Sequence, residues 1–108
     1  MRILFDQGTP VPIRKALKAH DVRTTAQEGW ANLKNGELLS LAEAAGFDVF
    51  LTTDKNIGCQ QNLAGRKIAI AVICQQQWPN LRPYVQRIAD AINEITSGAY
   101  IEIDIPAP

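Results

Sequence analysis

Residues 35–54 read NGELLSLAEAAGFDVFLTTD and place a well-marked helix directly before a strand that ends at an acid. Asn35 is a good helix N-cap and Gly46 a good C-terminal stop. The residues that would share the inward face of this helix are Leu38, Leu41, Ala42 and Ala45. The apolar run at 47–53 predicts a buried strand, and Asp54 follows it.

The same pattern of strand, acid and turn stands at the start of the chain. Residues 2–5 form a short apolar run that predicts a strand ending at Asp6, before a turn. Thr9 is a candidate cap for the helix that follows, whose start contains Pro10 and Pro12. Residues 21–25 are half apolar, which is typical of an edge strand.

The second half of the chain continues this alternation. A broken segment between Gly58 and Gly65 predicts one short helix and a loop. Residues 68–73 are continuously apolar, which indicates a central strand covered on both faces. Apolar positions across 81–96 predict a long helix, and alternation over 101–105 predicts a half-exposed edge strand.

Alternating strands and helices are typical of an α/β fold with a mostly parallel sheet and helices on both faces. The burial expected of each strand favours the order 2-1-3-4-5. We therefore predict a single three-layer α/β domain over residues 1–108, built on a five-stranded sheet. In such a sheet, ligands bind at the switch point between strands 1 and 3.

Composition excludes several function classes. The chain has no apolar run near the roughly 20 residues of a membrane span and no signal-like start, so we expect a cytoplasmic protein without a membrane partner. Its 11 basic and 11 acidic residues cancel, so net charge indicates no broad nucleic-acid face. Cys59, Cys74 and His20 are too few for a zinc site of roughly four ligands, so oxygen would have to bind any metal.

Three acids are placed to meet at the predicted switch point. Asp6 and Asp54 each end one of two neighbouring strands, and Glu37 lies in the first turn of the helix that leads into the second of them. Carboxylates without His or Cys suit Mg²⁺ or Mn²⁺. Such an ion activates water and stabilises charge on a phosphate. Each acid alone also has a structural reading, as a turn former or as a helix stabiliser.

The segments RILFDQGTP (2–10), NGELLSLAEAAGFDVFLTTDKN (35–56) and QQNL (60–63) resemble the short PIN-like domains, a branch of the PIN nuclease superfamily. The resemblance implies a PIN-like sandwich and a Mg²⁺- or Mn²⁺-dependent ribonuclease, in many relatives the toxin of a toxin–antitoxin pair. It implies Asp6, Glu37 and Asp54 as catalytic metal ligands. It also implies an RNA substrate, an antitoxin partner and a homodimer, for which the 101–105 edge is one candidate surface.

The chain departs from that family at two positions. Many relatives have an acid where this chain has Gln7, and a second acid where it has Asn56. Fewer carboxylates weaken metal affinity. The alternative function is therefore a non-catalytic PIN-like module that binds RNA or a partner protein. A receiver domain shares the strand order, but it would need an acidic pair at the first strand and a late Lys, and this chain has neither.

Further polar and aromatic residues are expected around the three acids. The residues predicted to support the metal or its water are Gln7, Asn35, Asn56, Gln61 and Asn62. The residues predicted to hold RNA are Lys34, Lys55, Arg66 and Trp30, and Lys67 is expected to flank the same crevice. Gln75, Gln76 and Gln77 follow the fourth strand and are expected to border it. Ordinary surface solvation, or for Trp30 the covering of a helix end, is the competing interpretation.

Overall fold

Short apolar strands form one parallel sheet in the computed structural model, which describes residues 1–57 and 65–106. The strands are β1 (Arg2–Phe5), β2 (Asp21–Thr24), β3 (Val49–Thr52), β4 (Ala69–Ile73) and β5 (Tyr100–Ile103). Their order is β2-β1-β3-β4-β5, and all four neighbouring pairs are parallel. The predicted strand order is confirmed, with β2 and β5 at the edges. Pairing of the β5 edge with a second copy stays a prediction.

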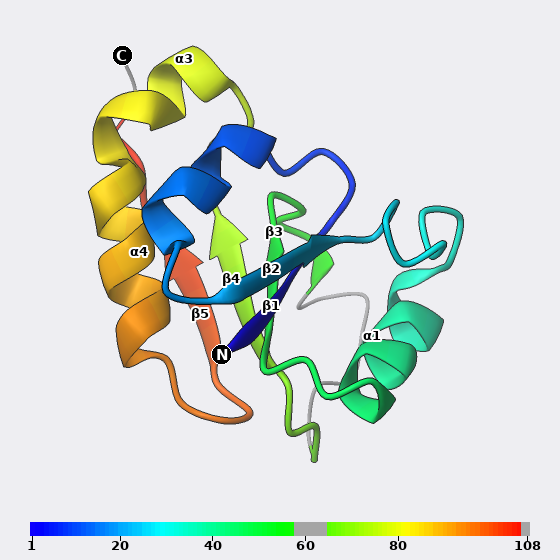
Figure 1. The fold of residues 1–108 in the computed structure, drawn as a ribbon. Coiled ribbons are helices and arrows are strands. Elements are labelled where there is room, and N and C mark those ends of the chain that lie inside the picture. Colours follow the sequence, from blue (N-terminus) through cyan, green and yellow to red (C-terminus); the bar gives the residue numbers. More distant parts are fainter. Residues whose placement is uncertain (58–64, 107–108) are drawn as a thin grey trace.

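Helices lie on both sides of this sheet (Figure 1). They are η1 (Val11–Leu17), α1 (Asn35–Ala44), α3 (Trp78–Leu81), η2 (Arg82–Tyr84) and α4 (Val85–Glu94). Because side chains alternate along a strand, Ile3 and Phe5 pack in one apolar cluster with Ile88 of α4, whereas Leu4 packs in another with Leu38 of α1. The sheet is therefore buried on both faces, as the apolar strands required.

The prediction of one continuous helix over 81–96 is wrong in its bounds. The chain instead forms α3, then the 3₁₀ turn η2, and only then α4, which ends at Glu94. Pro83 lies within η2. Proline has no N–H to donate and its ring crowds the preceding turn, so a continuous α-helix is interrupted there.

Two predicted helix caps are also wrong. Asn35 is the first helical residue of α1, and Lys34 occupies the cap position without a side-chain hydrogen bond. Thr9 is buried and its hydroxyl donates to the carbonyl oxygen of Leu51 at 3.1 Å, while Pro10 precedes η1. The two polar side chains bond instead to β3 and to the loop after it.

The inward face of α1 differs from the prediction by a rotation. Leu38, Leu39 and Ala42 are buried, whereas Leu41 is 39% exposed. The predicted end is confirmed, because Gly46 follows α1 with φ +86°. Periodicity alone does not distinguish an inward face that contains Leu39 from one that contains Leu41. In the structure, Leu39 belongs to the apolar cluster that α1 forms with Phe50 and Ile70 of the sheet.

No helix within the described ranges is long and apolar enough to cross a membrane. The short helix predicted between Gly58 and Gly65 falls mostly outside the described residues.

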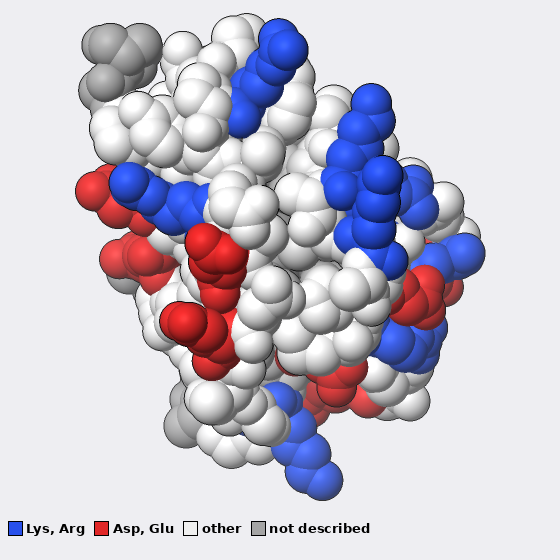
Figure 2. All heavy atoms as spheres, turned by 60° about the vertical axis from the view of Figure 1, so that its left-hand side comes forward, with Lys and Arg blue, Asp and Glu red and all other residues white. Residues whose placement is uncertain are grey.

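Charge is unevenly distributed although the net charge is zero. On the face shown in Figure 2, Lys and Arg side chains form a band on the right, and most of the Asp and Glu side chains gather on the left and below. A balanced total therefore coexists with local basic and acidic surfaces.

Gly98 is expected to be the least replaceable of the turn glycines. Its φ is +75°, and an added Cβ would lie 2.8 Å from the carbonyl oxygen of Arg66. Gly29 has a similar φ of +78° with nothing within 4 Å of such an atom. Gly29→Ala should therefore cost only the left-handed backbone penalty, about 1–2 kcal/mol, and Gly98→Ala measurably more in urea unfolding. Equal losses would show that the approach to Arg66 costs nothing.

Candidate active site

The carboxyl ends of β1 and β3 bring two acids together. Asp6 follows β1 directly, and its N–H donates to the carbonyl oxygen of Leu51 in β3 at 2.9 Å. Asp54 follows Thr52, the last residue of β3, by two positions. Because β1 and β3 are parallel neighbours, these residues share one edge of the sheet, at the predicted switch point.

Thr52 links the two acidic positions. Its hydroxyl donates to Oδ2 of Asp6 at 2.7 Å and accepts the N–H of Asp54 at 3.0 Å. Its side chain is fully buried, which fixes the hydroxyl between the two acids. The Asp54 carboxylate is held further by the N–H of Asn56, which donates to Oδ1 at 2.9 Å. The loop after β3 is therefore ordered around the acid it carries.

Asp6 is the perturbed acid of this site. Partial burial raises the pKa of its carboxyl above the ordinary 3.8. Hydrogen bonds from Thr52 and from the N–H of Gln7 lower the pKa, and the negative charge of Asp54 raises it again. The Asp6 carboxyl therefore lies close enough to Asp54 for the two charges to interact.

The raised pKa of Asp6 predicts a pH-dependent stability. A carboxyl whose pKa is higher in the folded protein favours folding while protonated, and this contribution disappears as pH rises from about 3.8 through the folded pKa. In chelator, wild type should therefore lose stability relative to Asp6→Asn between that pH and neutrality. Urea unfolding at several pH values measures this difference, and a constant difference would contradict the assignment.

Of the two predicted residues at the start of α1, Asn35 contacts Asp54, whereas Glu37 is exposed to solvent. The side-chain amide of Asn35 donates to Oδ2 of Asp54 at 3.4 Å, so the first turn of α1 contacts the loop after β3. Among the residues that the structure describes, no three His, Cys, Asp or Glu side chains form a group that could hold a metal. The structure thus brings together Asp6, Asp54 and Asn35, and Glu37 as a third ligand stays a prediction.

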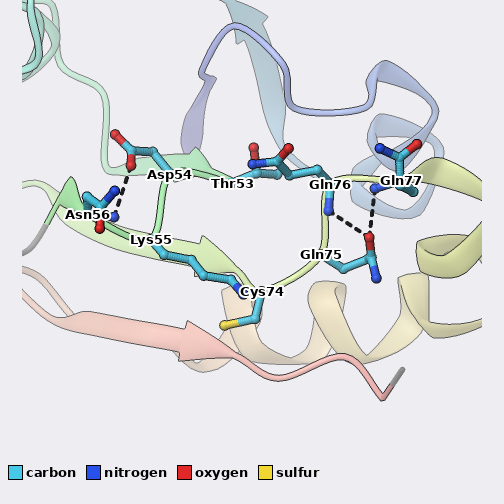
Figure 3. Close-up of a pocket in the computed structure, with 8 residues that line it drawn as sticks. All are labelled: Thr53, Asp54, Lys55, Asn56, Cys74, Gln75, Gln76 and Gln77. Atoms are coloured by element: carbon cyan, nitrogen blue, oxygen red, sulfur yellow. Dashed lines mark hydrogen bonds between the residues drawn. The ribbon is translucent and has the colours of Figure 1, made fainter. Parts of the chain in front are cut away.

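A hollow of about 510 Å³ opens beside Asp54 (Figure 3). Asp54, Lys55 and Asn56 line one side, and Cys74 with the three glutamines of the loop after β4 lines the other. The side-chain oxygen of Gln75 accepts the N–H groups of Gln76 and Gln77 at 3.0 and 2.9 Å, so that loop is held locally. Gln75, Gln76 and Gln77 thus border a hollow that contains Asp54, as expected, but Asp6 does not line this hollow.

Cys74 also lines this hollow, although it was not predicted from the sequence as a site residue. Partial burial and then the charge of Glu102 raise the pKa of its thiol, and Lys55 opposes this effect. The side chain of Lys55 extends toward it in Figure 3. The lining therefore contains the Lys55 cation and the Asp54 carboxylate beside amide, hydroxyl and thiol groups.

The remaining predicted residues fall into different surroundings. Trp30 packs edge-on against Phe47, with ring centroids 6.1 Å apart, beside the apolar cluster under α1. The guanidinium of Arg66 lies along α1, where it donates to the carbonyl of Gly36 and to the hydroxyl of Ser40. Lys34 and Gln7 are exposed. Gln61 and Asn62 lie outside the described residues.

Lys67 is not beside the crevice. It lies two residues before the start of β4, and its carbonyl oxygen accepts the N–H of Gly98. This is the amino edge of the sheet, opposite the edge that carries the two acids. The prediction failed because adjacency in sequence to a central strand does not indicate which end of that strand is near a site.

Thr52 is a residue of the site that was not predicted from the sequence. Thr52 lies within the apolar run at 47–53, where a threonine is expected to be part of the buried strand rather than a hydrogen-bonding bridge. The signal was its position opposite Asp6 in the predicted strand order.

Comparisons with protein families, with curated proteins and with solved structures found no match for this chain.

Proposed function

We propose that this protein is a divalent-metal-dependent ribonuclease whose site is formed by Asp6 and Asp54. The observation that carries the proposal is their meeting at the β1–β3 switch point through the buried hydroxyl of Thr52. Ligand sites of parallel α/β sheets lie at such points. Two neighbouring carboxylates there, of which Asp54 lines an open hollow, suit a phosphate-transfer reaction better than a purely structural turn.

The side chains present fit a hard cation. Asp6 and Asp54 offer carboxylate oxygens, the donors that Mg²⁺ and Mn²⁺ prefer, and a cation would offset the repulsion and desolvation that raise the Asp6 pKa. These two acids would hold the ion, with Glu37 as the further ligand that the sequence predicts. A bound ion supplies an activated water and charge stabilisation at the phosphate.

The other residues position the acids and the substrate. The Thr52 hydroxyl fixes Asp6, and the Asn35 amide fixes Asp54. Such hydrogen bonds to ligands set their orientation and their affinity for the ion. Lys55 lines the hollow beside Asp54 and offers a positive charge to an RNA phosphate.

The test combines Mn²⁺ calorimetry with cleavage of a labelled RNA. Saturable binding together with cleavage that needs the metal is the expected result. RNA binding that is unchanged by chelator, without turnover, would overturn the proposal in favour of a non-catalytic recognition module. That module is the function expected if Gln7 and Asn56 have removed too much negative charge.

A toxin role within this proposal predicts growth arrest when the protein is expressed in a bacterium without a cognate inhibitor. The arrest should disappear in Asp54→Asn. Arrest that persists in that variant would separate toxicity from the carboxylate site.

A further inference from the structure

A basic groove runs along η1, and neither Asp6 nor Asp54 lines it. Its upper part, about 490 Å³, lies between η1 and the segment from α3 to α4 and is lined by Lys15, Trp78 and Arg82 among others. Its lower part, about 350 Å³, lies between η1 and the start of β2 and is lined by Arg14, Lys15 and Lys18 among others. Because Lys15 lines both hollows, we treat them as one surface, the η1 groove.

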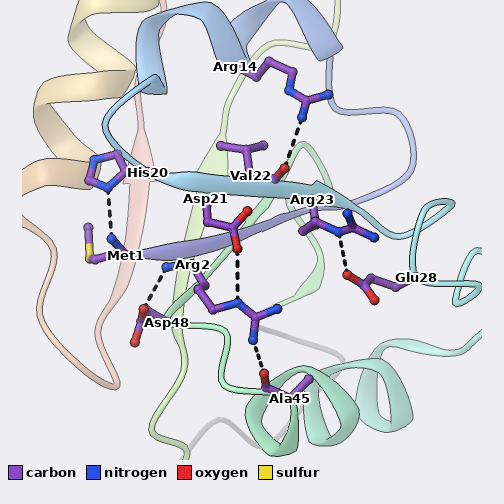
Figure 4. Close-up of polar contacts among 10 residues, drawn as sticks. All are labelled: Met1, Arg2, Arg14, His20, Asp21, Val22, Arg23, Glu28, Ala45 and Asp48. Atoms are coloured by element: carbon purple, nitrogen blue, oxygen red, sulfur yellow. Dashed lines mark hydrogen bonds and ion pairs between the residues drawn. The ribbon is translucent and has the colours of Figure 1, made fainter.

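The cations of the η1 groove lack acidic partners. Within the described parts of the chain, the ion pairs involve Arg2, Arg23 and Arg66, and none involves Lys15, Lys18 or Arg82. The one acid in the lining, Asp21, is paired with Arg2 at 3.4 Å (Figure 4). The positive charge of the groove is therefore left for an external anion.

The Arg14 side chain is held in position by a hydrogen bond to β2. Figure 4 shows its guanidinium reaching β2, where Nη2 donates to the carbonyl oxygen of Val22 at 3.2 Å. A guanidinium has five N–H donors, so one such bond leaves others for a phosphate. Arg14 thus adds a fixed positive group at the lower end of the groove.

Trp78 gives the groove a stacking surface. It is half-buried and packs against the apolar cluster under α4, which holds the ring in place while it lines the upper hollow. Cations alone suit any polyanion, whereas an aromatic ring between them suits a single-stranded nucleic acid, whose bases stack while its phosphates contact Lys and Arg. This combination favours RNA over an acidic protein segment.

The groove begins where the candidate active site ends. Gln77 lines the hollow beside Asp54, and the next residue, Trp78, lines the η1 groove. Consecutive residues of the chain therefore line the two hollows.

We propose that the η1 groove binds the single-stranded RNA that flanks the cleavage position, with Trp78 stacking a base and Lys15, Lys18 and Arg82 contacting phosphates. The identity of this RNA as a substrate rests on the proposed ribonuclease function. Binding in the groove does not, because none of its residues belongs to the acidic site.

The first test is the salt dependence of RNA binding. Fluorescence anisotropy of a short labelled oligouridylate is measured in chelator at several salt concentrations. The slope of log K against log salt, where K is the association constant, is negative, and each lost phosphate contact makes it less negative by about 0.7. The double variant Lys15→Ala/Lys18→Ala should therefore make the slope less negative by about 1.4. Lys67→Ala is the matched control, because Lys67 lines a different hollow, with Met1 and Ser97, and should leave the slope unchanged.

The second test isolates stacking. Trp78→Ala should weaken binding roughly 5-fold to 100-fold, as expected for one lost base stack, while Trp78→Phe should stay near wild type. Circular dichroism checks that each variant is folded. Should Trp78→Ala unfold, the lysine pair still decides the question.

The outcomes separate this inference from the proposed function. Groove-dependent binding without metal-dependent cleavage supports the groove and overturns the ribonuclease. Metal-dependent cleavage with binding indifferent to the groove variants overturns the groove alone. Displacement of the oligouridylate by polyglutamate of equal charge would overturn RNA as the occupant and indicate an acidic protein partner.

Discussion

Asp6→Asn is expected to abolish saturable Mn²⁺ binding and to lower RNA cleavage by about 100-fold or more, a loss typical of removing a group that stabilises transition-state charge. Asp6 lies beside Asp54 at this edge, and the Thr52 hydroxyl donates to the Asp6 carboxylate and accepts the Asp54 N–H. The same variant should be more stable than wild type at neutral pH in chelator, because burial raises the pKa of this carboxyl. Calorimetry, a cleavage assay and urea unfolding measure the three effects.

Two further variants control this result. Thr52→Val keeps the side-chain shape and both carboxylates but removes the hydroxyl that bonds the Asp6 carboxylate and the Asp54 N–H, so Mn²⁺ binding should weaken about 10- to 100-fold rather than vanish. Asp90→Asn changes an exposed acid of α4 and should change neither binding nor cleavage. Full metal binding by Asp6→Asn would contradict the proposed ligand set.

Leu39→Ala is expected to destabilise the protein by about 2–5 kcal/mol, enough to consume much of the stability of a domain this size. Leu39 is fully buried in the cluster between α1 and the sheet, so the smaller side chain leaves a cavity. Thermal or urea unfolding monitored by circular dichroism gives the loss.

Leu41→Ala is the matched control, with the same substitution two residues along the same helix. Leu41 is 39% exposed, and alanine is the better helix former, so the cost should stay below about 1 kcal/mol. A larger loss at Leu41 than at Leu39 would restore the inward face predicted from periodicity and contradict the observed rotation of α1.

The strand order followed from features that are local in the sequence. The continuous apolar run that forms β4 demanded a covered central position, and the half-polar runs that form β2 and β5 suited edges. An acid directly after each of two neighbouring strands then had to open onto one edge, because parallel strands end together. This much of the candidate site, Asp6 beside Asp54, was predictable from residue pattern and connection rules alone.

Other features depended on residues far apart in sequence. Asn35 was a reasonable cap, yet its amide contacts Asp54, because α1 is placed against the loop after β3. Arg66 was a reasonable RNA contact, yet its guanidinium donates hydrogen bonds to Gly36 and Ser40 of α1. In both cases one polar group had several partners of similar strength, and the packing of whole elements chose among them.

The sequence by itself therefore determined the parallel sheet, its order and the edge at which two acids meet, since burial and alternation constrain each strand separately. Only the tertiary structure decided which stripe of α1 faces inward, that Thr52 bridges the acids, and that η1 and Trp78 form one basic groove. These outcomes depend on the rotation and spacing of packed elements, which a periodic pattern leaves free and which side-chain packing fixes.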